Sequence, residues 1–553
     1  MNYLDKYEFW LNNVLEKDQS ALKNLTEDDL KERFGKDLTF GTGGIRGIMG
    51  MGSSMINHYT LAKVTHGYAK YLVNKNEGNK KRLKVVISYD NRLNSQSFAL
   101  SSALIFTSYD IEVIMLEKLA PTPLLSYAIR HYKADGGIMI TASHNPKEYN
   151  GYKVYDKTGS QLNLLESRLV IEEINKLDTW FFKDKSKSKL IKFVYHEVIN
   201  SYLKDIKGIL LNEGKYNKTN IKILYSPLHG TGSEIVPTAL ELNGFSVIPF
   251  WSHLINDPDF SNTPSTNPEE AITYDLLIDE AKKIDAGIIM VNDPDSDRLG
   301  IAVKQNDEFV LINGNQTASL ILNYLLTYGK YKNKQMVYTT VVTTPLLKAI
   351  SYKYNQHITE TLTGFKFIGE QINLNEGKFD LVFAAEESYG NLISDIVRDK
   401  DGVQAVLLLS EIANFYYEQN KTLVDVLEDI YKEFGYFMEE TISITMTGIV
   451  GTEKIGRIMN AVRENDLKLN NTKILEKIDY QIPYQAEFNL LPSDNVVKYI
   501  YEDNSWVVFR PSGTEPKLKI YIGVCEKDKK KSKQKIESII KQLTDMMVMI
   551  EES

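Results

Sequence analysis

Short apolar runs that end in polar loops recur along the chain and predict the buried strands of α/β sheets. Three such runs are 138–140, 286–291 and 379–385, and 506–509 is a fourth. Runs of this length suit strands buried on both faces, although periodicity alone does not separate them from buried helix segments. A helix predicted at 95–107 lies between strands predicted at 85–88 and 111–116. This alternation of strand and helix predicts an α/β first domain.

Other segments carry recognisable periodicity. Leu4, Tyr7, Leu11 and Val14 fall at helical spacing and predict an amphipathic helix near the N-terminus. The polar loops at 143, 293, 386 and 510 indicate one loop per domain. Further strands are expected at 221–225, 335–342 and 440–446, a hairpin at 299–312, and a helix starting near residue 403.

Length and composition limit the possible functions. A chain of 553 residues predicts three or four domains of roughly 100–200 residues each. The net charge of −8 argues against a general nucleic-acid or membrane-surface role. Cys525 is the only cysteine, so an internal disulfide is impossible and a reducing compartment is expected. The early charges and the lack of a long apolar run predict a cytoplasmic protein without a membrane span.

The segment Thr-Ala-Ser-His-Asn-Pro at 141–146 follows the first of the apolar runs. Asn145-Pro146 is a turn signal, which places Ser143 on a loop just past a strand end, where open sheets bind ligands. A serine hydroxyl becomes a nucleophile only with help from a base or a metal. His144 and Lys153 are nearby groups that can move protons or neutralise anions. The alternative is a polar turn whose serine caps a helix.

A glycine-rich segment at 40–47 contains Arg46 as its one charge. Glycines let a backbone approach a ligand closely, and the arginine would then face an anion. The alternative is a flexible surface turn with a solvated arginine.

Asp293, Asp295 and Asp297 alternate after a predicted strand. Three carboxylates this close repel one another unless a cation joins them, and Mg²⁺ prefers oxygen ligands. A calcium EF-hand is excluded, because its sixth and twelfth positions would be Arg298 and Lys304 instead of Gly and Glu. A solvated acidic turn is the remaining alternative.

Two more loops carry groups that suit a phosphorylated sugar. Glu386 and Ser388 can bond vicinal hydroxyls, or the glutamate can be a buried or capping group. Arg510-Pro-Ser-Gly-Thr has the parts of a phosphate clamp, or it is a capped turn. The P-loop and Gly-x-Ser-x-Gly motifs are both absent. Together the loops indicate phosphoryl transfer through a serine on a phosphosugar.

These four loops resemble those of the α-D-phosphohexomutase superfamily, which contains the phosphoglucomutases and phosphomannomutases. The serine, aspartate, Glu-Glu-Ser and Arg-Pro-Ser-Gly-Thr segments look like its phosphoserine, metal, sugar and phosphate loops. Segments at 225–232, 267–270 and 363–366 further resemble the branch of phosphoglucomutase-2 and phosphopentomutase-like enzymes. Pro294, Ser296 and Ala385 depart from residues common in the family, but they lie between or beside the functional positions.

The resemblance implies a fold of class α/β with four domains. Three are similar mixed α/β sheet domains, and a smaller C-terminal α+β domain completes a central cleft. We expect a phosphoserine-bearing domain at 1–205, a metal-binding domain at 206–325, a sugar-recognition domain at 326–435 and a phosphate-binding domain at 436–553.

The resemblance also implies the site. Ser143 would carry the phosphoryl group and bind Mg²⁺ with Asp293, Asp295 and Asp297, and Lys153 or His144 would move the proton. Arg46 would surround the transferring group with them, and glucose 1,6-bisphosphate or mannose 1,6-bisphosphate would be the activator. The residues expected to bind substrate are Arg298, Thr363, Gly364, Glu386, Ser388, Lys400, Arg510, Ser512, Gly513 and Thr514.

The expected activity is interconversion of hexose 1-phosphate and hexose 6-phosphate, of glucose or mannose, by a monomer or homodimer. A phosphopentomutase acting on ribose or deoxyribose phosphates is the alternative within the family. A non-catalytic phosphosugar-binding protein and a serine-dependent phosphomonoesterase are alternatives from other functional classes.

Overall fold

The computed structural model describes the chain except residues 1, 42, 79–80, 178–187, 332–333, 447, 513–516 and 553, and the side chains of 448–450 and 549–552. The chain forms two compact units. Unit 1 comprises 1–312, 372–374 and 390–418, and unit 2 comprises 313–371, 375–389 and 419–553.

Unit 1 begins with three short helices that enclose a small core of their own. They are α1 (Tyr3–Asn13), α2 (Glu16–Lys23) and α3 (Glu27–Phe34). Trp10, Val14, Leu22 and Phe34 form this core. The predicted N-terminal helix is confirmed, but Leu4 is 46% exposed, and Trp10 is the buried anchor of α1 instead.

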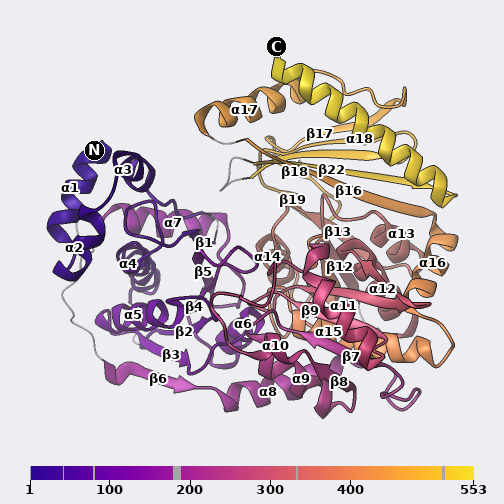
Figure 1. Cartoon of the computed structure of the whole chain (residues 1–553), viewed down its shortest axis with the longest axis horizontal. Helices are drawn as coiled ribbons and strands as arrows, with labels where there is room; N and C mark the ends of the chain where they lie inside the picture. The colour runs from indigo at the N-terminus through magenta and orange to yellow at the C-terminus, as the bar shows by residue number, and fades with distance from the viewer. Residues whose placement is uncertain are drawn as a thin grey trace. The chain divides into compact units, whose positions relative to one another are not determined.

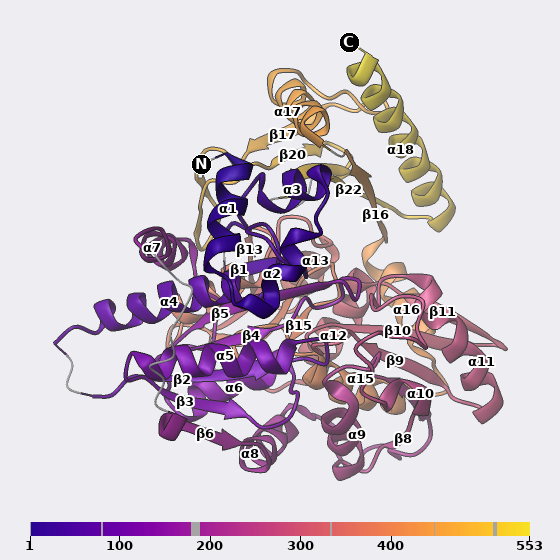
Figure 2. The ribbon, with the colours of Figure 1, turned by 60° about the vertical axis from the view of Figure 1, so that its left-hand side comes forward.

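The first sheet has the order β1-β5-β4-β2-β3-β6 (Figure 1). Strands β2, β3, β4 and β6 are mutually parallel, whereas β5 runs antiparallel to β4 and β1. β4 is buried along its whole length, as expected of a central strand covered on both faces. Helices α5 and α6 both pack against β2 and β4 (Figure 2). The elements are β1 (Gly44–Ile48), α4 (His58–Lys75), β2 (Lys84–Tyr89), α5 (Ser95–Ser108), β3 (Glu112–Leu116), α6 (Thr122–His131), β4 (Gly136–Ile140), β5 (Tyr149–Asp156), α7 (Leu164–Asn175), η1 (Ser188–Leu190), β6 (Ile191–Val194), α8 (His196–Ile206) and η2 (Lys207–Ile209).

The second sheet of unit 1 has the order β11-β10-β9-β7-β8. β7, β8 and β9 are parallel, and the predicted hairpin of β10 and β11 extends the sheet antiparallel to β9. Helix α15 packs against α9 and β10. The elements are β7 (Lys222–Ser226), α9 (Gly232–Leu242), β8 (Ser246–Pro249), α10 (Trp251–Leu254), η3 (Ala271–Tyr274), α11 (Asp275–Ile284), β9 (Ile288–Asn292), β10 (Leu299–Gln305), β11 (Glu308–Ile312) and α15 (Gly402–Tyr417). The short strand β15 (Asn391–Leu392) also falls within unit 1 but is not a strand of this sheet.

Unit 2 begins with a parallel sheet in which β12 lies between β13 and β14. β12 and β14 match the strands predicted at 335–342 and 379–385, whereas no strand was predicted at β13. β12 is buried throughout. The elements are α12 (Gly314–Tyr328), β12 (Gln335–Thr340), α13 (Leu346–Lys353), β13 (His357–Thr361), α14 (Phe365–Leu374), β14 (Asp380–Ala385) and α16 (Leu423–Phe434).

The C-terminal part of unit 2 is an antiparallel sheet of order β16-β22-β21-β20-β17. α17 and α18 lie on one side of it (Figure 1), and their apolar residues share its core. β16 pairs with β22 over ten residues, which explains why it begins at Tyr436, before the predicted start at 440. The elements are β16 (Tyr436–Thr445), α17 (Gly448–Glu464), β17 (Ile474–Asp479), β18 (Tyr484–Gln485), β19 (Leu490–Leu491), β20 (Val497–Tyr501), β21 (Trp506–Pro511), β22 (Lys517–Glu526) and α18 (Lys529–Glu552).

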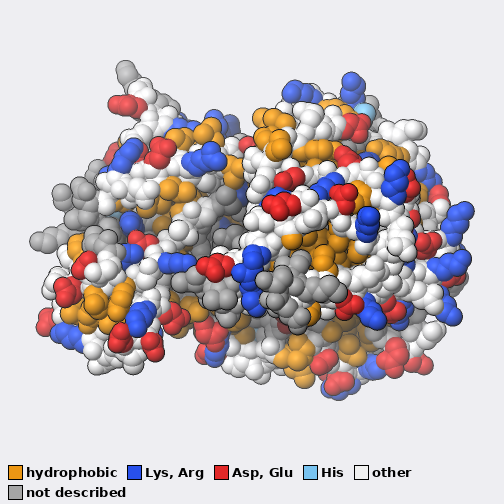
Figure 3. All heavy atoms as spheres, turned by 90° about the horizontal axis from the view of Figure 1, so that it is seen from above, with side chains coloured by type: hydrophobic (Ala, Val, Ile, Leu, Met, Phe, Trp, Pro, Cys, Tyr) orange, Lys and Arg blue, Asp and Glu red, His pale blue; other side chains and the backbone are white. Residues whose placement is uncertain are grey.

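The predicted fold class is confirmed. Sheets that contain parallel strands and pack against helices come first, and an antiparallel sheet that packs against two helices follows. On the face drawn in Figure 3, Lys and Arg side chains are interspersed with Asp and Glu. Within the described residues, every helix is too short or too polar to cross a membrane. The predicted domain boundaries stay predictions.

The half-buried carboxyl of Glu439 connects β16 to the parallel sheet of unit 2. Glu439 accepts a hydrogen bond from Thr344 Oγ1 at 2.5 Å. Burial raises the pKa of Glu439 from 4.5 to about 7, although hydrogen bonds from Thr344 and Asn315 favour its ionised form. Between pH 4.5 and about pH 7, Glu439 binds more protons in the folded chain than in the unfolded chain. Its contribution to the free energy of unfolding therefore falls as the pH rises from 4.5 to 7.

We predict that Glu439→Gln becomes more stabilising, relative to the wild type, as the pH rises through this window. The relative gain in the free energy of unfolding should reach about 1–3 kcal/mol between about pH 5 and about pH 8, because the variant carries no charge to bury. Denaturant unfolding at the two pH values measures it, with Glu453→Gln on the exposed face of α17 as the control. An equal difference at both pH values would contradict the prediction.

Candidate active site

Ser143 lies on the loop after β4, as predicted from the apolar run before it. Its φ of 53° is in the left-handed region, which is uncommon for a residue other than glycine. The side chain is nearly buried, with 5% of the residue exposed. Ser143 Oγ donates to Asp293 Oδ2 at 2.7 Å and lies 3.3 Å from His144 Nδ1. The two segments are 150 residues apart in the chain, and the structure brings them into direct contact.

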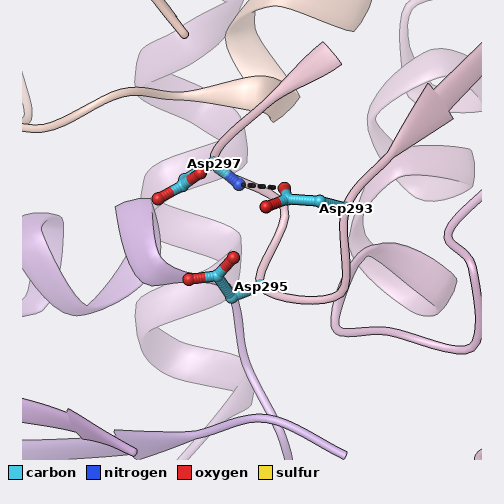
Figure 4. Close-up of side chains that lie close together, drawn as sticks. All are labelled: Asp293, Asp295 and Asp297. Atoms are coloured by element: carbon cyan, nitrogen blue, oxygen red, sulfur yellow. Dashed lines mark hydrogen bonds between the residues drawn. The ribbon is translucent and has the colours of Figure 1, made fainter. Parts of the chain in front are cut away.

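The three predicted aspartates lie on the loop between β9 and β10, with their side chains close together (Figure 4). One ligand oxygen from each lies within 4.8 Å of the others. Asp293 Oδ1 accepts from the backbone N–H groups of Asp297, at 3.2 Å, and Arg298, at 3.0 Å. The loop is therefore folded around the first carboxylate, which fixes the other two relative to it.

Two lysines balance part of this buried negative charge. Lys153 Nζ donates to Asp295 Oδ2 at 2.7 Å and to Asp297 Oδ2 at 3.2 Å, and Lys400 Nζ lies 3.3 Å from Asp297 Oδ2. Burial disfavours the ammonium of Lys153, but Asp295 and Asp297 hold its pKa above the usual value. Burial likewise disfavours the Asp297 carboxylate, but Lys400 and Lys153 hold its pKa below the usual value. Burial, Asp295 and Asp297 raise the pKa of Asp293 well above its usual value, so the trio still lacks positive charge.

The remaining carboxylate oxygens fit a hard divalent cation. Asp295 Oδ1 and Asp297 Oδ1 are buried and have no hydrogen-bond partner among the described residues. A buried acceptor without a partner is costly, and the donors gathered here are all oxygens, the ligands that Mg²⁺ prefers. The residues therefore fit the predicted Mg²⁺ site, with Ser143 Oγ beside it.

The His144 imidazole is kept neutral by its surroundings. Burial lowers its pKa well below the usual value, and the charges of Arg298 and Arg46 lower it further. Arg298 donates to Glu269 Oε1 at 2.6 Å. Arg46 is exposed on β1, opposite Gly151 of β5. The glycine-rich segment around it, for which a flexible surface turn was the alternative, thus ends in a strand that places Arg46 near the serine loop.

Several residues that support the aspartate loop were not singled out from the sequence. Thr122, the first residue of α6, donates from Oγ1 to Asp295 Oδ2 at 2.8 Å and from its backbone N to Asp295 O at 2.9 Å. Asp399 accepts from Tyr155 OH at 2.7 Å and lies 3.4 Å from Lys400 Nζ. A threonine opening a helix and an aspartate before a lysine are ordinary local patterns, so no sequence signal marks them.

Glycines on two other segments allow the backbone to approach the same loop. A Cβ at Gly230 would lie 2.3 Å from Pro294 O, and a Cβ at Gly402 would lie 2.6 Å from Ser296 O. The N–H of Thr231 donates to Pro294 O at 2.8 Å. The segment at 225–232 therefore packs closely against the aspartate loop and donates a backbone hydrogen bond to it.

In unit 2, the predicted sugar-binding residues gather where α14 begins and β14 ends. Glu386 is 5% exposed and accepts from Gly364 N at 2.8 Å, where Gly364 has a φ of +120°. Thr363 Oγ1 is buried without a hydrogen-bond partner in the described part of the chain. Ser388 is half-buried on the turn that follows Glu386.

The predicted phosphate clamp begins at the end of β21. Arg510 is half-buried, and Ser512 donates from its backbone N to Lys517 O at 2.7 Å. Gly513 and Thr514 lie outside the described residues. Burial lowers the pKa of Lys366 to about 8, where the charge of Asp494 opposes the shift and that of Arg510 adds to it. Lys366, at the start of α14, is therefore a second cation in the neighbourhood of Arg510.

Comparison with known sequences identifies the family. Four domain models of phosphoglucomutase/phosphomannomutase match the chain: α/β/α domain I at 37–179, domain II at 200–306, domain III at 313–434 and the C-terminal domain at 458–537. The chain belongs to the phosphoglucomutase/phosphomannomutase family, whose members are mutases of the isomerase class.

Individual relatives agree with this assignment. The chain is 35% identical to a phosphoglucomutase of Staphylococcus epidermidis over 92% of this chain and 95% of that one. It is also 35% identical to a phosphoglucomutase of Staphylococcus aureus over 97% and 98%. A crystal structure of the Paramecium phosphoglucomutase parafusin has a similar fold, with a TM-score of 0.68, 20% identity and coverage of 93% and 94%.

These comparisons confirm the predicted superfamily and enzyme class, and they favour the phosphohexomutase prediction over the phosphopentomutase alternative. The assignment to the branch of phosphoglucomutase-2 and phosphopentomutase-like enzymes stays a prediction. The roles of the individual site residues also stay predictions.

We predict that Asp295→Asn and Asp297→Asn each weaken Mg²⁺ binding by about 100-fold or more, because each removes a ligand where even outer-shell changes cost 10–100-fold. Isothermal titration with Mg²⁺ measures the affinity. Asp285→Asn, at an exposed aspartate that pairs with Lys304, is the control and should bind Mg²⁺ as the wild type does. Unchanged affinity in both site variants would contradict the assignment.

Proposed function

We propose that this chain interconverts hexose 1-phosphate and hexose 6-phosphate, of glucose, mannose or both, through a phosphoserine at Ser143. The observation that carries the proposal is the position of Ser143 Oγ, 2.7 Å from Asp293 Oδ2 at the edge of a buried carboxylate trio. A hydroxyl at such a place can carry a phosphoryl group next to the cation that neutralises it. The relatives described above are named phosphoglucomutase, and the matching family models also name phosphomannomutase.

The transfer proceeds in two balanced steps. A free hydroxyl oxygen of the bound hexose monophosphate forms a bond to phosphorus as the bond from phosphorus to Ser143 Oγ breaks. The hydroxyl proton passes to a protein base, and the sugar leaves this step as the 1,6-bisphosphate. After the sugar turns end for end, Ser143 Oγ forms a bond to its other phosphorus as the bond from that phosphorus to the sugar oxygen breaks. That oxygen takes back the proton, and the isomeric monophosphate leaves.

Charge neutralisation supplies most of the catalysis in such transfers, because the protein forms few new bonds. Asp293, Asp295, Asp297 and Ser143 would hold Mg²⁺. When bound, this ion neutralises the phosphoryl oxygens. Lys153 is fixed beside them by Asp295 and Asp297, as the distances of 2.7 and 3.2 Å indicate.

Two groups can move the proton. His144 Nδ1 lies 3.3 Å from Ser143 Oγ and is neutral, as a base must be. Lys153 lies on the strand that follows the serine loop and has its ammonium at the carboxylates. Arg46 and Arg298 add positive charge around the histidine, and Lys400 adds positive charge beside Asp297.

The other predicted substrate-binding residues would hold the substrate by its unreactive parts. Arg510, Ser512, Gly513 and Thr514 would bind the phosphate that does not react. Glu386 and Ser388 would bond the sugar hydroxyls next to Thr363 and Gly364. The bond from Gly364 N supports this role for Glu386, since it fixes the carboxylate in one orientation.

A bisphosphate activator follows from this route. An enzyme that loses its phosphoryl group to water cannot start the first step. Glucose 1,6-bisphosphate or mannose 1,6-bisphosphate would restore the phosphoserine by the second step run alone. The serine-dependent phosphomonoesterase alternative differs here, since it would release phosphate faster than it interconverts isomers.

We predict that Ser143→Ala lowers mutase activity by about 10⁴-fold or more, since loss of a nucleophile abolishes the covalent route. Activity is measured by conversion of glucose 1-phosphate to glucose 6-phosphate. Intact-mass analysis should show one added phosphoryl group on the wild type after exposure to glucose 1,6-bisphosphate and none on the variant. Ser97→Ala, on the exposed face of α5, is the matched control. A Ser143→Ala protein that works at the wild-type rate would rule out the proposed route.

A further inference from the structure

The buried guanidinium of Arg92 binds the backbone of the serine loop. Arg92 follows β2, and its side chain is fully buried. Its Nη2 donates to Ser143 O at 2.7 Å and to Asn145 O, and its Nη1 donates to Pro146 O at 2.8 Å and Tyr149 O at 3.0 Å. One side chain therefore binds four carbonyl groups of a seven-residue stretch that begins at the reactive serine.

The charge of Arg92 is balanced by a carboxylate that is equally buried. Asp90 Oδ2 lies 3.2 Å from Arg92 Nε, and both side chains are fully buried. Burial raises the pKa of Asp90, and Arg92 opposes this shift. Ser95 Oγ donates to Asp90 Oδ1 at 2.7 Å and in turn accepts from Asn150 Nδ2 at 3.0 Å. A buried ion pair contributes little net stability, so fixing the geometry of this loop is the better explanation for it.

The loop at 257–266, between α10 and η3, also contacts the serine loop and the Arg92 segment. The ring centroid of Phe260 lies 5.2 Å from the guanidinium carbon of Arg92. Thr266 Oγ1 donates to His144 O at 2.8 Å. Asn91 Nδ2 donates to Asp257 O at 3.1 Å. These contacts join the Arg92 segment to the sheet that carries the aspartates.

The serine loop needs such support because Ser143 is held in an unfavourable backbone conformation. A left-handed φ at a non-glycine residue is strained and persists only where its surroundings enforce it. The carbonyl of Ser143 itself is one of the four that Arg92 binds. Turning this peptide toward the usual φ would break that bond and move Oγ away from Asp293.

We propose that Arg92 is a positioning residue that holds Ser143 in the left-handed conformation from which Oγ reaches the aspartates. This inference rests on the proposed phosphoserine route and adds to it a residue that never touches the substrate. The planar guanidinium is essential to this role, because it presents several N–H donors in a fixed fork. A lysine at this position would keep the charge for Asp90, but it could not bind four carbonyls.

The test compares Arg92→Lys with the wild type. We expect kcat to fall about 100-fold, the size of effect that a misplacement of about 1 Å produces, with KM changed by less than about threefold. In a single turnover with glucose 1,6-bisphosphate, phosphorylation of Ser143 followed by intact mass should slow by the same factor. Mg²⁺ affinity should stay at the wild-type value. Arg82→Lys, at an exposed arginine that pairs with Asp110, is the matched control.

A second variant asks whether the guanidinium itself is required. In Arg92→Ala, added guanidinium ion at concentrations far below those that unfold the protein should restore part of the phosphorylation rate, whereas ammonium should not. An Arg92→Lys protein with the wild-type phosphorylation rate would overturn the inference, as would a folded Arg92→Ala protein that guanidinium does not rescue. If the wild type itself takes up no phosphoryl group, the proposed function falls, and this inference falls with it.

Discussion

The site depends on one electrostatic constraint: three carboxylates are buried within 4.8 Å of one another. Charges in a low-dielectric interior repel strongly, and an uncompensated one is severely destabilising. Lys153 and Lys400 bind Oδ2 of Asp295 and Asp297, and Oδ1 of each has no hydrogen-bond partner among the described residues. The loop can therefore accept one more positive charge.

The fold supplies the compensating groups from separate parts of unit 1. Lys153 comes from β5 of the first sheet, Lys400 from the segment before α15, and Thr122 from the start of α6. Gly230 and Gly402 let two more segments approach the loop where a side chain would collide with its backbone. The first and second sheets thus meet at the aspartates, and this meeting places Ser143 beside them.

Much of the fold could be predicted because buried strands appear in the sequence as short apolar runs. The runs that became β4, β9 and β14 are mostly apolar and mostly buried, because strands covered on both faces have no solvent side. The polar loops after them could also be found, because ligands collect at strand ends in such sheets. The pairing of Ser143 with Asp293, 150 residues apart, was not visible in the pattern and came from the family resemblance.

The rest could not be predicted because it depends on contacts distant in sequence. Arg92 and Asp90 look like two surface charges after a strand, and only the folded loop makes them a buried pair. The glycines at 40–47 fit either a ligand-binding loop or a turn, and only the pairing with β5 makes Gly44–Ile48 a strand. Leu4 fits a helical stripe, yet α1 buries Trp10 instead, because the cluster with Phe34 lies on that side.

The most direct measurement is anomalous diffraction from crystals of the wild-type protein soaked in Mn²⁺, a hard dication that can replace Mg²⁺. We predict one strong anomalous peak among the carboxylates of Asp293, Asp295 and Asp297, within bonding distance of Ser143 Oγ or of a phosphoryl group attached to it. An aspartate trio that stays free of Mn²⁺ at concentrations that support full activity would contradict the account.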